Sequence, residues 1–206
     1  MRQGPTVLLT GFGPFPGLDA NASTRFVKSL AGLAARRFTA QFIHHAILPT
    51  QWADAPLELS KLKTRFQPDV VLHFGVSKHA KGMVLEQVAR NICGCSQDAC
   101  GVVPESSHIA AGAPDELRAT YPAQEIHATL SRAAIPVELS QDAGSYLCNA
   151  ILYDSLLEDT ERTKGAHPSS AMIGFIHLPV NLGHPDCPLS WRMALKAGLD
   201  IINVCS

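Results

Sequence analysis

The amino-acid sequence predicts a three-layer α/β/α fold with a mixed, largely parallel β-sheet. Short apolar runs alternate along the chain with longer runs whose apolar residues recur at helical spacing, which is typical of parallel strands joined by helices. Only a short link separates the apolar runs at 69–75 and 83–92, which predicts a hairpin and therefore a mixed sheet. A chain of 206 residues that is 46% hydrophobic can bury a sizeable core, so we expect a single domain over residues 1–206.

Six strands are expected where short apolar runs end at turn-forming residues, near 6–12, 39–48, 69–75, 83–92, 135–140 and 171–177. Five helices are expected near 21–36, 51–66, 122–133, 146–158 and 188–203. The helix near 146–158 carries Ile151, Leu152, Ser155 and Leu156 at helical spacing. The stretch 101–115 is rich in Pro, Gly and Asp, and it is predicted to be a long loop at the functional face rather than a domain boundary.

Charge and patterning exclude several kinds of partner. The formal net charge of −1 provides no positive surface for nucleic acid or for an anionic membrane. No basic-then-apolar export pattern opens the chain, and no apolar run approaches membrane length. We therefore expect a cytoplasmic protein that binds neither nucleic acid nor membrane and whose six cysteines are reduced.

Cys148 lies where a cysteine can act as a nucleophile. The run Ile135–Leu139 predicts a strand, Gly144 and Ser145 predict a turn with a candidate N-cap, and a helix follows. Cys148 would then lie in the first turn of that helix, where free backbone N–H groups and the helix dipole favour a thiolate. The alternative is a buried small apolar residue at a strand-to-helix junction, and this segment alone does not decide between them.

A candidate base and a candidate acid occur on two other predicted strands. His177 ends the last strand, and ligands of open α/β sheets bind at the carboxyl ends of strands. Glu86 shares one face of its predicted strand with Val84, Val88 and Arg90, and a carboxylate among apolar neighbours usually needs a partner. A histidine satisfied by local hydrogen bonds and an exposed edge-strand glutamate are the alternatives, and both stay open on the residues alone.

Several sequence blocks occur in one order along the chain: LLTGFGPFPG at 8–17, NAS at 21–23, LPT at 48–50, the segment around Glu86, GSYLCN at 144–149 and GFIHLP at 174–179. Together they resemble the signature of pyroglutamyl peptidase I, or pyrrolidone-carboxylate peptidase, a family of cysteine peptidases. The resemblance spans nearly the whole chain. It implies hydrolysis of the amide bond after an N-terminal pyroglutamyl residue, no metal or organic cofactor, and a homo-oligomer, either a dimer or a tetramer.

The resemblance implies that Cys148 is the nucleophile, His177 the base and later the acid, and Glu86 the third catalytic residue. In this scheme the Cys148 thiolate attacks the amide carbonyl, and backbone N–H groups near Leu147 and Cys148 stabilise the oxyanion. His177 protonates the departing amine, and water then hydrolyses the thioester. Glu86 orients the imidazole and stabilises its charged form.

A pyroglutamyl residue is a flat, neutral lactam, so its site needs apolar faces and a few fixed hydrogen-bonding groups. The resemblance implies that Phe12 and Phe15 supply those faces and that Asn21 organises their loop. The rest of the lining is expected from Thr50, Val76, Tyr146 and Leu147. Without the resemblance, the residues alone favour ordinary core packing for Phe12 and Phe15.

Three segments depart from the family pattern. The family's GQAGGR stretch is Gly75–Ala80 here, and only its first glycine is kept; the Asn-Pro-Ser turn is Asn21–Ser23, without its proline. Ser96 stands where many members carry an arginine. We expect Arg90, a candidate substrate-binding residue, to replace that arginine at the mouth of the site and steady the nucleophile turn, or to neutralise Glu86 directly. The competing interpretation is a surface arginine.

Cys93, Cys95 and Cys100, with His73 or His79, form a candidate metal cluster. Zinc sites favour pairs separated by two to four residues and no second pair of that kind exists, so no metal is expected.

Two other function classes remain open. One is a relative that binds a pyroglutamyl or related lactam ligand without efficient cleavage. The altered loop after Gly75 favours this class. The other is a nucleoside-phosphorylase-like enzyme, which shares the general fold and would need phosphate. Fold alone does not choose among functions, and the candidate catalytic residues favour the peptidase.

Overall fold

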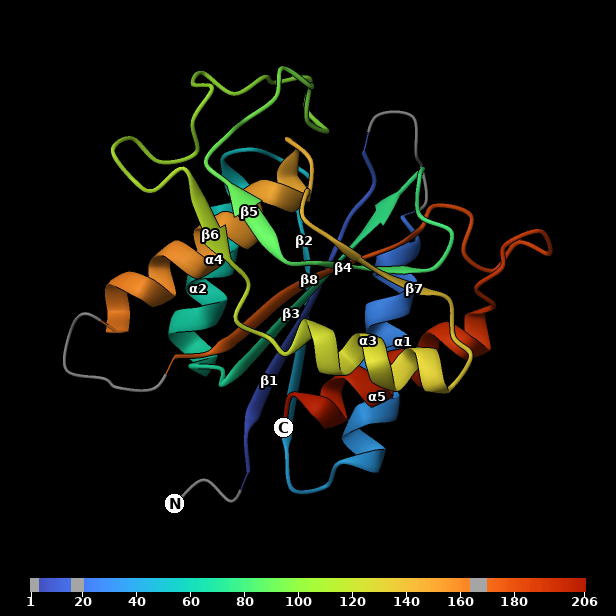
Figure 1. The fold of residues 1–206 in the computed structure, drawn as a ribbon. Coiled ribbons are helices and arrows are strands. Elements are labelled where there is room, and N and C mark those ends of the chain that lie inside the picture. Colours follow the sequence, from blue (N-terminus) through green and yellow to red (C-terminus); the bar gives the residue numbers. More distant parts are fainter. Residues whose placement is uncertain (1–3, 16–20, 164–169) are drawn as a thin grey trace.

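The computed structural model describes residues 4–15, 21–163 and 170–206; residues 16 and 17, which end the first sequence block, lie outside these ranges. The strands of the described residues are β1 (Thr6–Phe12), β2 (Phe42–Leu48), β3 (Val70–Ser77), β4 (Met83–Glu86), β5 (Val88–Arg90), β6 (Glu116–Arg118), β7 (Val137–Ser140) and β8 (Met172–Pro179). The helices are α1 (Ala22–Arg37), α2 (Asp54–Phe66), α3 (Ala123–Arg132), α4 (Leu147–Thr163) and α5 (Trp191–Val204) (Figure 1).

Six strands form one mixed sheet in the order β2-β1-β3-β8-β4-β7. Strands β2, β1, β3 and β8 are parallel, whereas β4 is antiparallel to β8 and parallel to β7. The predicted fold class is therefore confirmed, but the predicted hairpin between β3 and β4 is wrong, because β8 lies between them. Nearly all of β8 is buried, and a strand buried on both faces is stable only at the centre of a sheet.

The single strand predicted over 83–92 is also wrong, because the chain forms two strands there. Gln87 interrupts the run: its N–H donates to Ser140 O at 2.9 Å and its carbonyl accepts from Ala119 N at 3.0 Å. After this point β5 leaves the main sheet and pairs with β6, which the sequence did not predict. Glu86 and Arg90 thus belong to different sheets and do not share a strand face.

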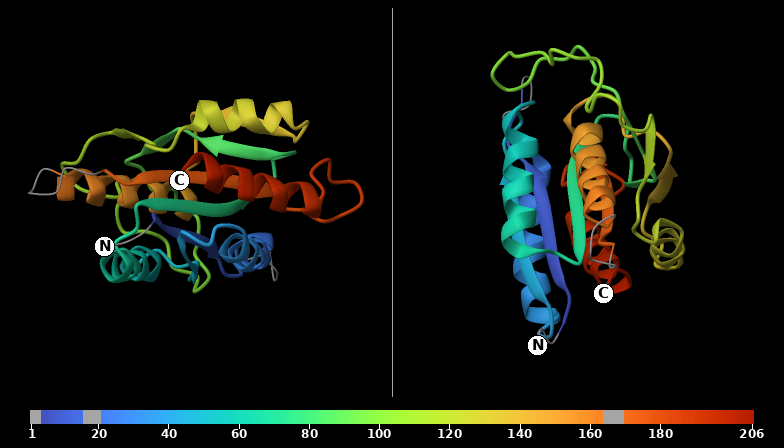
Figure 2. Two further views of the ribbon diagram at one scale, coloured as in Figure 1. Left: turned by 90° about the horizontal axis from the view of Figure 1, so that it is seen from below. Right: turned by 90° about the vertical axis from the view of Figure 1, so that its left-hand side faces the viewer.

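Helices cover both faces of the main sheet and complete the three layers (Figure 2). On one face α1, α3 and α5 pack on Leu72, Phe74 and Ile176, whereas on the other α2 and α4 pack on Val71 and Phe175. Because side chains alternate along a strand, β8 sends Ile176 into the first core and Phe175 and His177 to the face covered by α2 and α4. This face carries the site.

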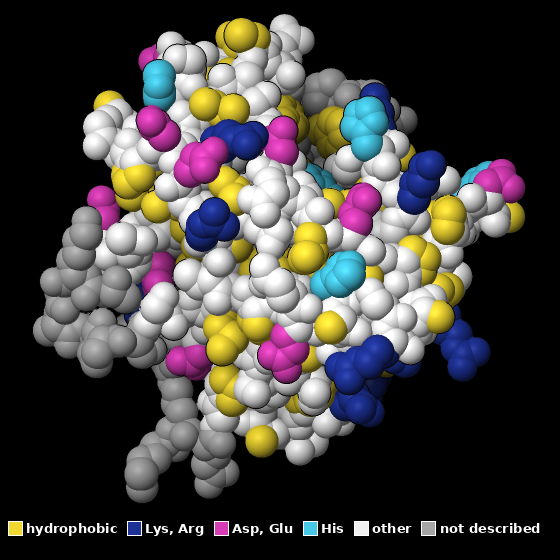
Figure 3. All heavy atoms as spheres, viewed as in Figure 1, with side chains coloured by type: hydrophobic (Ala, Val, Ile, Leu, Met, Phe, Trp, Pro, Cys, Tyr) yellow, Lys and Arg dark blue, Asp and Glu magenta, His cyan; other side chains and the backbone are white. Residues whose placement is uncertain are grey.

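Residues 91–115 form the predicted long loop, which begins earlier than the stretch 101–115 and contains no helix or strand. The loop lies at the top of the molecule in Figure 1, beside the start of α4. The face seen in Figure 3 carries both acidic and basic side chains. Within the described residues, no helix has the length and apolar character needed to cross a bilayer.

Candidate active site

The turn before α4 presents Cys148 as the sequence predicted. Helix α4 begins at Leu147, so Cys148 lies in its first turn, and its side chain is partly exposed. Gly144 has a φ of +82°, in the left-handed region that favours glycine. The expected capping by Ser145 is wrong, because Tyr146 immediately precedes the helix and its carbonyl accepts from Ala150 N at 3.1 Å.

The first turn of α4 also supplies hydrogen-bond donors. Backbone N–H groups in the first turn of a helix have no partner inside the helix. Among the described residues, no backbone carbonyl outside α4 accepts a hydrogen bond from the N–H group of Leu147 or Cys148. They are therefore available to an oxyanion that forms beside the Cys148 sulfur.

His177 and Glu86 form a buried pair on neighbouring strands. The distance between His177 Nδ1 and Glu86 Oε1 is 2.8 Å, and the two side chains are 9% and 2% exposed. The register of β4 and β8 pairs Val84 with His177 and Glu86 with Phe175, which places these side chains on one face. The Phe175 ring lies 4.8 Å from the imidazole, so both ring packing and the carboxylate fix the orientation of His177.

The surroundings of His177 favour its charged form. Burial alone would lower the pKa of this imidazole, but interactions with Cys148 and then with Glu86 outweigh burial and raise the pKa to about 10. The second Glu86 oxygen, Oε2, is buried and has no hydrogen-bond partner among the described residues. The arrangement therefore suits a thiolate–imidazolium pair, which provides a nucleophile and a general acid together.

Gly75 lies directly beneath the nucleophile. A Cβ at this position would lie 3.1 Å from Cys148 Sγ and 2.7 Å from the Phe175 ring. Only glycine lets β3 approach the sulfur so closely. This role could not be predicted from the sequence, in which the only signal is the glycine that the family pattern keeps.

A small pocket of about 40 Å³ adjoins Cys148. Its lining contains Gly75, Cys148 and every predicted substrate-contacting position except Arg90, namely Phe12, Phe15, Asn21, Thr50, Val76, Tyr146 and Leu147. The Asn21 amide and the Thr50 hydroxyl both donate to Gly13 O, at 3.1 and 3.0 Å. Asn21 Oδ1 also accepts from Ser23 N at 3.0 Å, so Asn21 organises the loop as expected.

Aromatic rings form the walls of this pocket. Phe12 packs 6.2 Å from Phe175, and Phe15 packs 6.4 Å from Tyr146. Trp52, which the sequence did not single out, contacts Tyr146 edge-on at 5.2 Å from the other side. Burial and then Asp98 raise the pKa of Tyr146 to about 12, so its phenol stays neutral near pH 7.

A larger, open cavity of about 680 Å³ meets the small pocket at Cys148. Both cavities share Phe15, Val76, Tyr146 and Cys148. His177 and Glu86 line only the open cavity. The candidate nucleophile thus lies between a small pocket on one side and a larger cavity, which contains the candidate general acid His177, on the other.

Arg90 contacts the nucleophile turn rather than either cavity. Its guanidinium lies 3.1 Å from Asp142 in that turn and 3.1 Å from Glu116 on β6. Its backbone N–H donates to Asn149 Oδ1 at 2.8 Å, and Asn149 Nδ2 donates back to Arg90 O at 2.8 Å. Asn149 was not among the residues predicted from the sequence, although its position directly after Cys148 was a signal.

The loop 91–115 braces the nucleophile turn. Gly94 N donates to Ser145 O at 2.7 Å, and the Tyr146 hydroxyl donates to Gln97 O at 3.0 Å. Asp98 accepts from Trp52 N at 3.1 Å and so holds the loop to the start of α2. Ser96, which replaces the family's arginine, offers its carbonyl to the Trp52 ring N–H at 3.1 Å.

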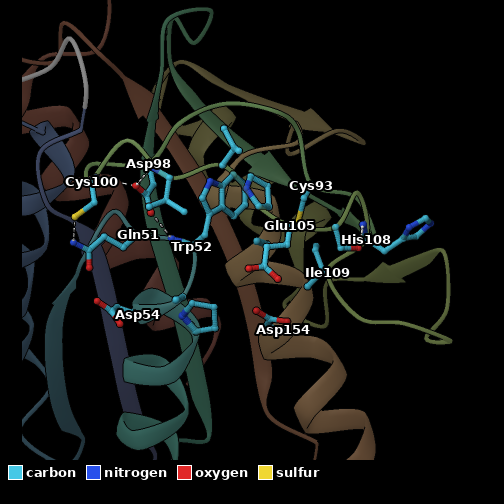
Figure 4. A pocket seen from close by; sticks show the side chains of 17 residues that line it. Gln51, Trp52, Asp54, Cys93, Asp98, Cys100, Glu105, His108, Ile109 and Asp154 are labelled. Carbon is cyan, nitrogen blue, oxygen red and sulfur yellow. Dashed lines mark hydrogen bonds between the residues drawn. The ribbon is translucent and has the colours of Figure 1, made fainter.

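A cavity of about 530 Å³ separates this loop from α2 and α4, away from Cys148 and His177. Figure 4 shows Cys93 on its wall and the Cys100 sulfur accepting from the Gln51 amide. His73 is buried elsewhere, between the Thr10 and Ser155 hydroxyls at 2.6 and 3.0 Å. In the described ranges, no three His, Cys, Asp or Glu side chains are grouped so that they could hold a metal ion.

Comparisons with known proteins match most of the chain. A sequence model of the family described as pyroglutamyl peptidase matches residues 5–184. The chain is 32% identical to pyrrolidone-carboxylate peptidase 1 of Ralstonia nicotianae, over 96% of this chain and 90% of that protein. It is 33% identical to the pyrrolidone-carboxylate peptidase of Pyrococcus furiosus, over 84% and 80%.

Solved structures give the same result. A mutant pyrrolidone carboxyl peptidase from Pyrococcus furiosus superposes with a TM-score of 0.84 at 29% identity, covering 97% of each chain. Pyroglutamyl peptidase I from Bacillus amyloliquefaciens superposes with a TM-score of 0.82 at 28% identity, covering 98% of this chain and 96% of that one. The likeness therefore extends over the whole fold and not only over the sequence blocks.

Proposed function

Because the chain belongs to the pyroglutamyl peptidase family, we propose that it hydrolyses the amide bond after an N-terminal pyroglutamyl residue of peptides. One observation carries the assignment of the residues: Cys148 and the paired His177 and Glu86 meet where a small aromatic-lined pocket joins an open cavity. The small pocket would hold the lactam ring, and the open cavity would hold the leaving peptide.

The reaction follows from this geometry. The Cys148 thiolate attacks the pyroglutamyl carbonyl, and the N–H groups of Leu147 and Cys148 stabilise the oxyanion. Imidazolium His177 gives its proton to the departing amine, and the acyl group stays on sulfur as a thioester. Neutral His177 then takes a proton from water, which attacks the thioester and regenerates the thiolate. Glu86 holds the ring and stabilises its charge in each half of the cycle.

The pocket explains why a lactam would be selected. Phe12, Phe15 and Tyr146 offer apolar ring faces, and apart from the Cys148 thiolate the lining holds no charged group. A free N-terminal amine would bring a positive charge among these rings without a carboxylate to pair with, and burying an unpaired charge is strongly unfavourable. Every step uses groups of this chain, so we propose that no cofactor is needed.

The test is turnover of fluorogenic amides of pyroglutamate, glutamate and proline by the purified protein. We expect hydrolysis of the pyroglutamyl amide alone, inhibition by thiol alkylators and no inhibition by chelators. Equal rates on the glutamate or proline amide would overturn the specificity. Inhibition by chelators together with resistance to alkylators would overturn the thiol mechanism.

We further propose that the chain acts as a single domain in the cytoplasm and as a homo-oligomer, either a dimer or a tetramer. One sheet runs through the described residues and helices cover both of its faces, and all six cysteines are free thiols, as a reducing compartment requires. Light scattering on the eluted protein would measure the oligomeric state, and a monomer at micromolar concentration would contradict this part.

A further inference from the structure

The open cavity beside Cys148 indicates which residues the leaving peptide contacts. Its volume of about 680 Å³ falls within the range of about 300–1,000 Å³ that ligand sites occupy. The inference rests on the proposed function, because that function decides which side of Cys148 the leaving peptide occupies.

The direction of the leaving peptide follows from the strand order. The small pocket lies at the ends of β1 and β3, which contribute Phe12 and Val76 to its lining. Gly75 of β3 lies beneath Cys148. His177, which protonates the leaving amine, is one strand further across the sheet, on β8. A peptide that continues in this direction crosses β4 and reaches β7.

Glu138 lies on that path. The register aligns Gly75 with His177, His177 with Val84 and Val84 with Glu138. Residues aligned in this way point to the same face of a sheet, and His177, Val84 and Glu138 all line the open cavity. At a strand spacing of about 4.8 Å, Glu138 is roughly 10 Å across the sheet from His177. An extended chain covers about 3.3–3.6 Å per residue, so a long side chain on either of the first two leaving residues would reach Glu138.

Among the described acidic residues that line this cavity, Glu138 is the one without an ion-pair partner. Glu86 pairs with His177, and Asp142 pairs with Arg90 at 3.1 Å. Among the described residues, Glu138 makes no ion pair or hydrogen bond through its exposed side chain. Two basic side chains, Lys78 and His79, also line the cavity and follow the end of β3. Both therefore lie in the loop that borders the cavity, not on the strands that the peptide crosses.

We propose that Glu138 makes the enzyme prefer substrates with a lysine or arginine among the first two residues after pyroglutamate. The exposed carboxylate would attract a cationic side chain and repel an anionic one. Contacts between exposed charges are individually weak, so we expect a kcat/KM ratio of at least about threefold between matched lysine and glutamate substrates at low salt.

The experiment compares kcat/KM for pairs of C-terminally amidated peptides, pyroglutamyl-Lys-Ala-amide against pyroglutamyl-Glu-Ala-amide, and the same pair with the charged residue in the second position. Amidation removes the terminal carboxylate, which Lys78 would otherwise attract. Each ratio is measured on one enzyme preparation, so it does not depend on how much of a variant is folded.

In the wild type, at least one pair should favour lysine. Glu138→Gln should bring that ratio close to one, and Glu138→Lys should invert it. Lys78→Gln, a matched change in the loop that borders the cavity, should keep the preference for lysine. A wild-type ratio of one in both pairs, an unchanged ratio in Glu138→Gln, or loss of the preference in Lys78→Gln would each overturn the proposal.

The failure of the proposed function is distinguishable. If the wild type does not cleave a fluorogenic pyroglutamyl amide, which has no peptide beyond the scissile bond, the function itself is wrong. If it cleaves that amide and shows flat ratios, only the role of Glu138 is wrong.

Discussion

Replacing Gly75 by alanine should slow the enzyme while leaving it folded. The new Cβ would lie 2.7 Å from Phe175 Cζ and 3.1 Å from Cys148 Sγ, whereas ordinary contacts begin at 3.4 Å. The Phe175 ring would therefore have to retreat by about 0.7 Å and the sulfur by about 0.3 Å. Phe175 is fully buried and packs against His177, so its retreat would move the imidazole as well.

The magnitude follows from two general costs. Adding a methyl group to a close-packed core costs about 1–3 kcal/mol of stability. Misplacing catalytic groups by about 1 Å costs up to about 100-fold in rate. For a displacement of 0.3 to 0.7 Å we expect kcat/KM on a pyroglutamyl amide to fall by about 10- to 100-fold, with a fall in the thermal midpoint of a few degrees.

Gly32→Ala is the matched control. Gly32 is exposed within α1, and a Cβ there would meet nothing within 4 Å. The same substitution should raise helix stability by up to about 1 kcal/mol and leave kcat/KM unchanged. A folded Gly75→Ala protein with wild-type kcat/KM would refute the view that β3 must approach the sulfur this closely.

Three further predictions concern the groups around the nucleophile. Cys148→Ser should lose nearly all turnover, because a hydroxyl is a far poorer nucleophile in a site built for a thiolate, whereas Cys93→Ser should stay within about threefold; full activity of Cys148→Ser would remove the assignment. Arg90→Ala should lower kcat/KM by about tenfold, and Asp142→Asn should add little to it because the two act through one contact; additive losses would contradict that shared contact, and unchanged kinetics would make Arg90 a surface residue. In a pH titration by NMR the His177 ring should titrate near pH 10 in the wild type and clearly lower in Cys148→Ala, because the thiolate that raises its pKa is gone; equal midpoints would contradict the ion pair. The folded-state pKa lies above its ordinary value of 6.5, so protonated His177 stabilises the fold fully below about pH 6.5 and this stability is lost as the pH rises through about 10.

The sequence by itself determined the layers of the fold and the local setting of the nucleophile. Period-two and helical patterns encode which face of each element is apolar, and this local information was enough to predict most elements, including the β8 strand that ends near His177. The turn before Cys148 could be predicted for the same reason, since Gly144 and the following helix are features of one short segment. The family resemblance then predicted that Cys148, His177 and Glu86 act together. Periodicity could not predict this, because the three residues lie in separate segments.

The tertiary structure decided what depends on residues far apart in the chain. No local pattern shows that β8 inserts between β3 and β4, because strand order follows from which strand is buried on both faces. The end of β4 at Glu86 depends on hydrogen bonds from Gln87 to Ser140 and from Ala119 to Gln87, and that break is what directs Arg90 to the nucleophile turn. The roles of Gly75 and Glu138 likewise arise only where strands meet, since close approach to a sulfur and alignment across a sheet are properties of packed neighbours rather than of a segment.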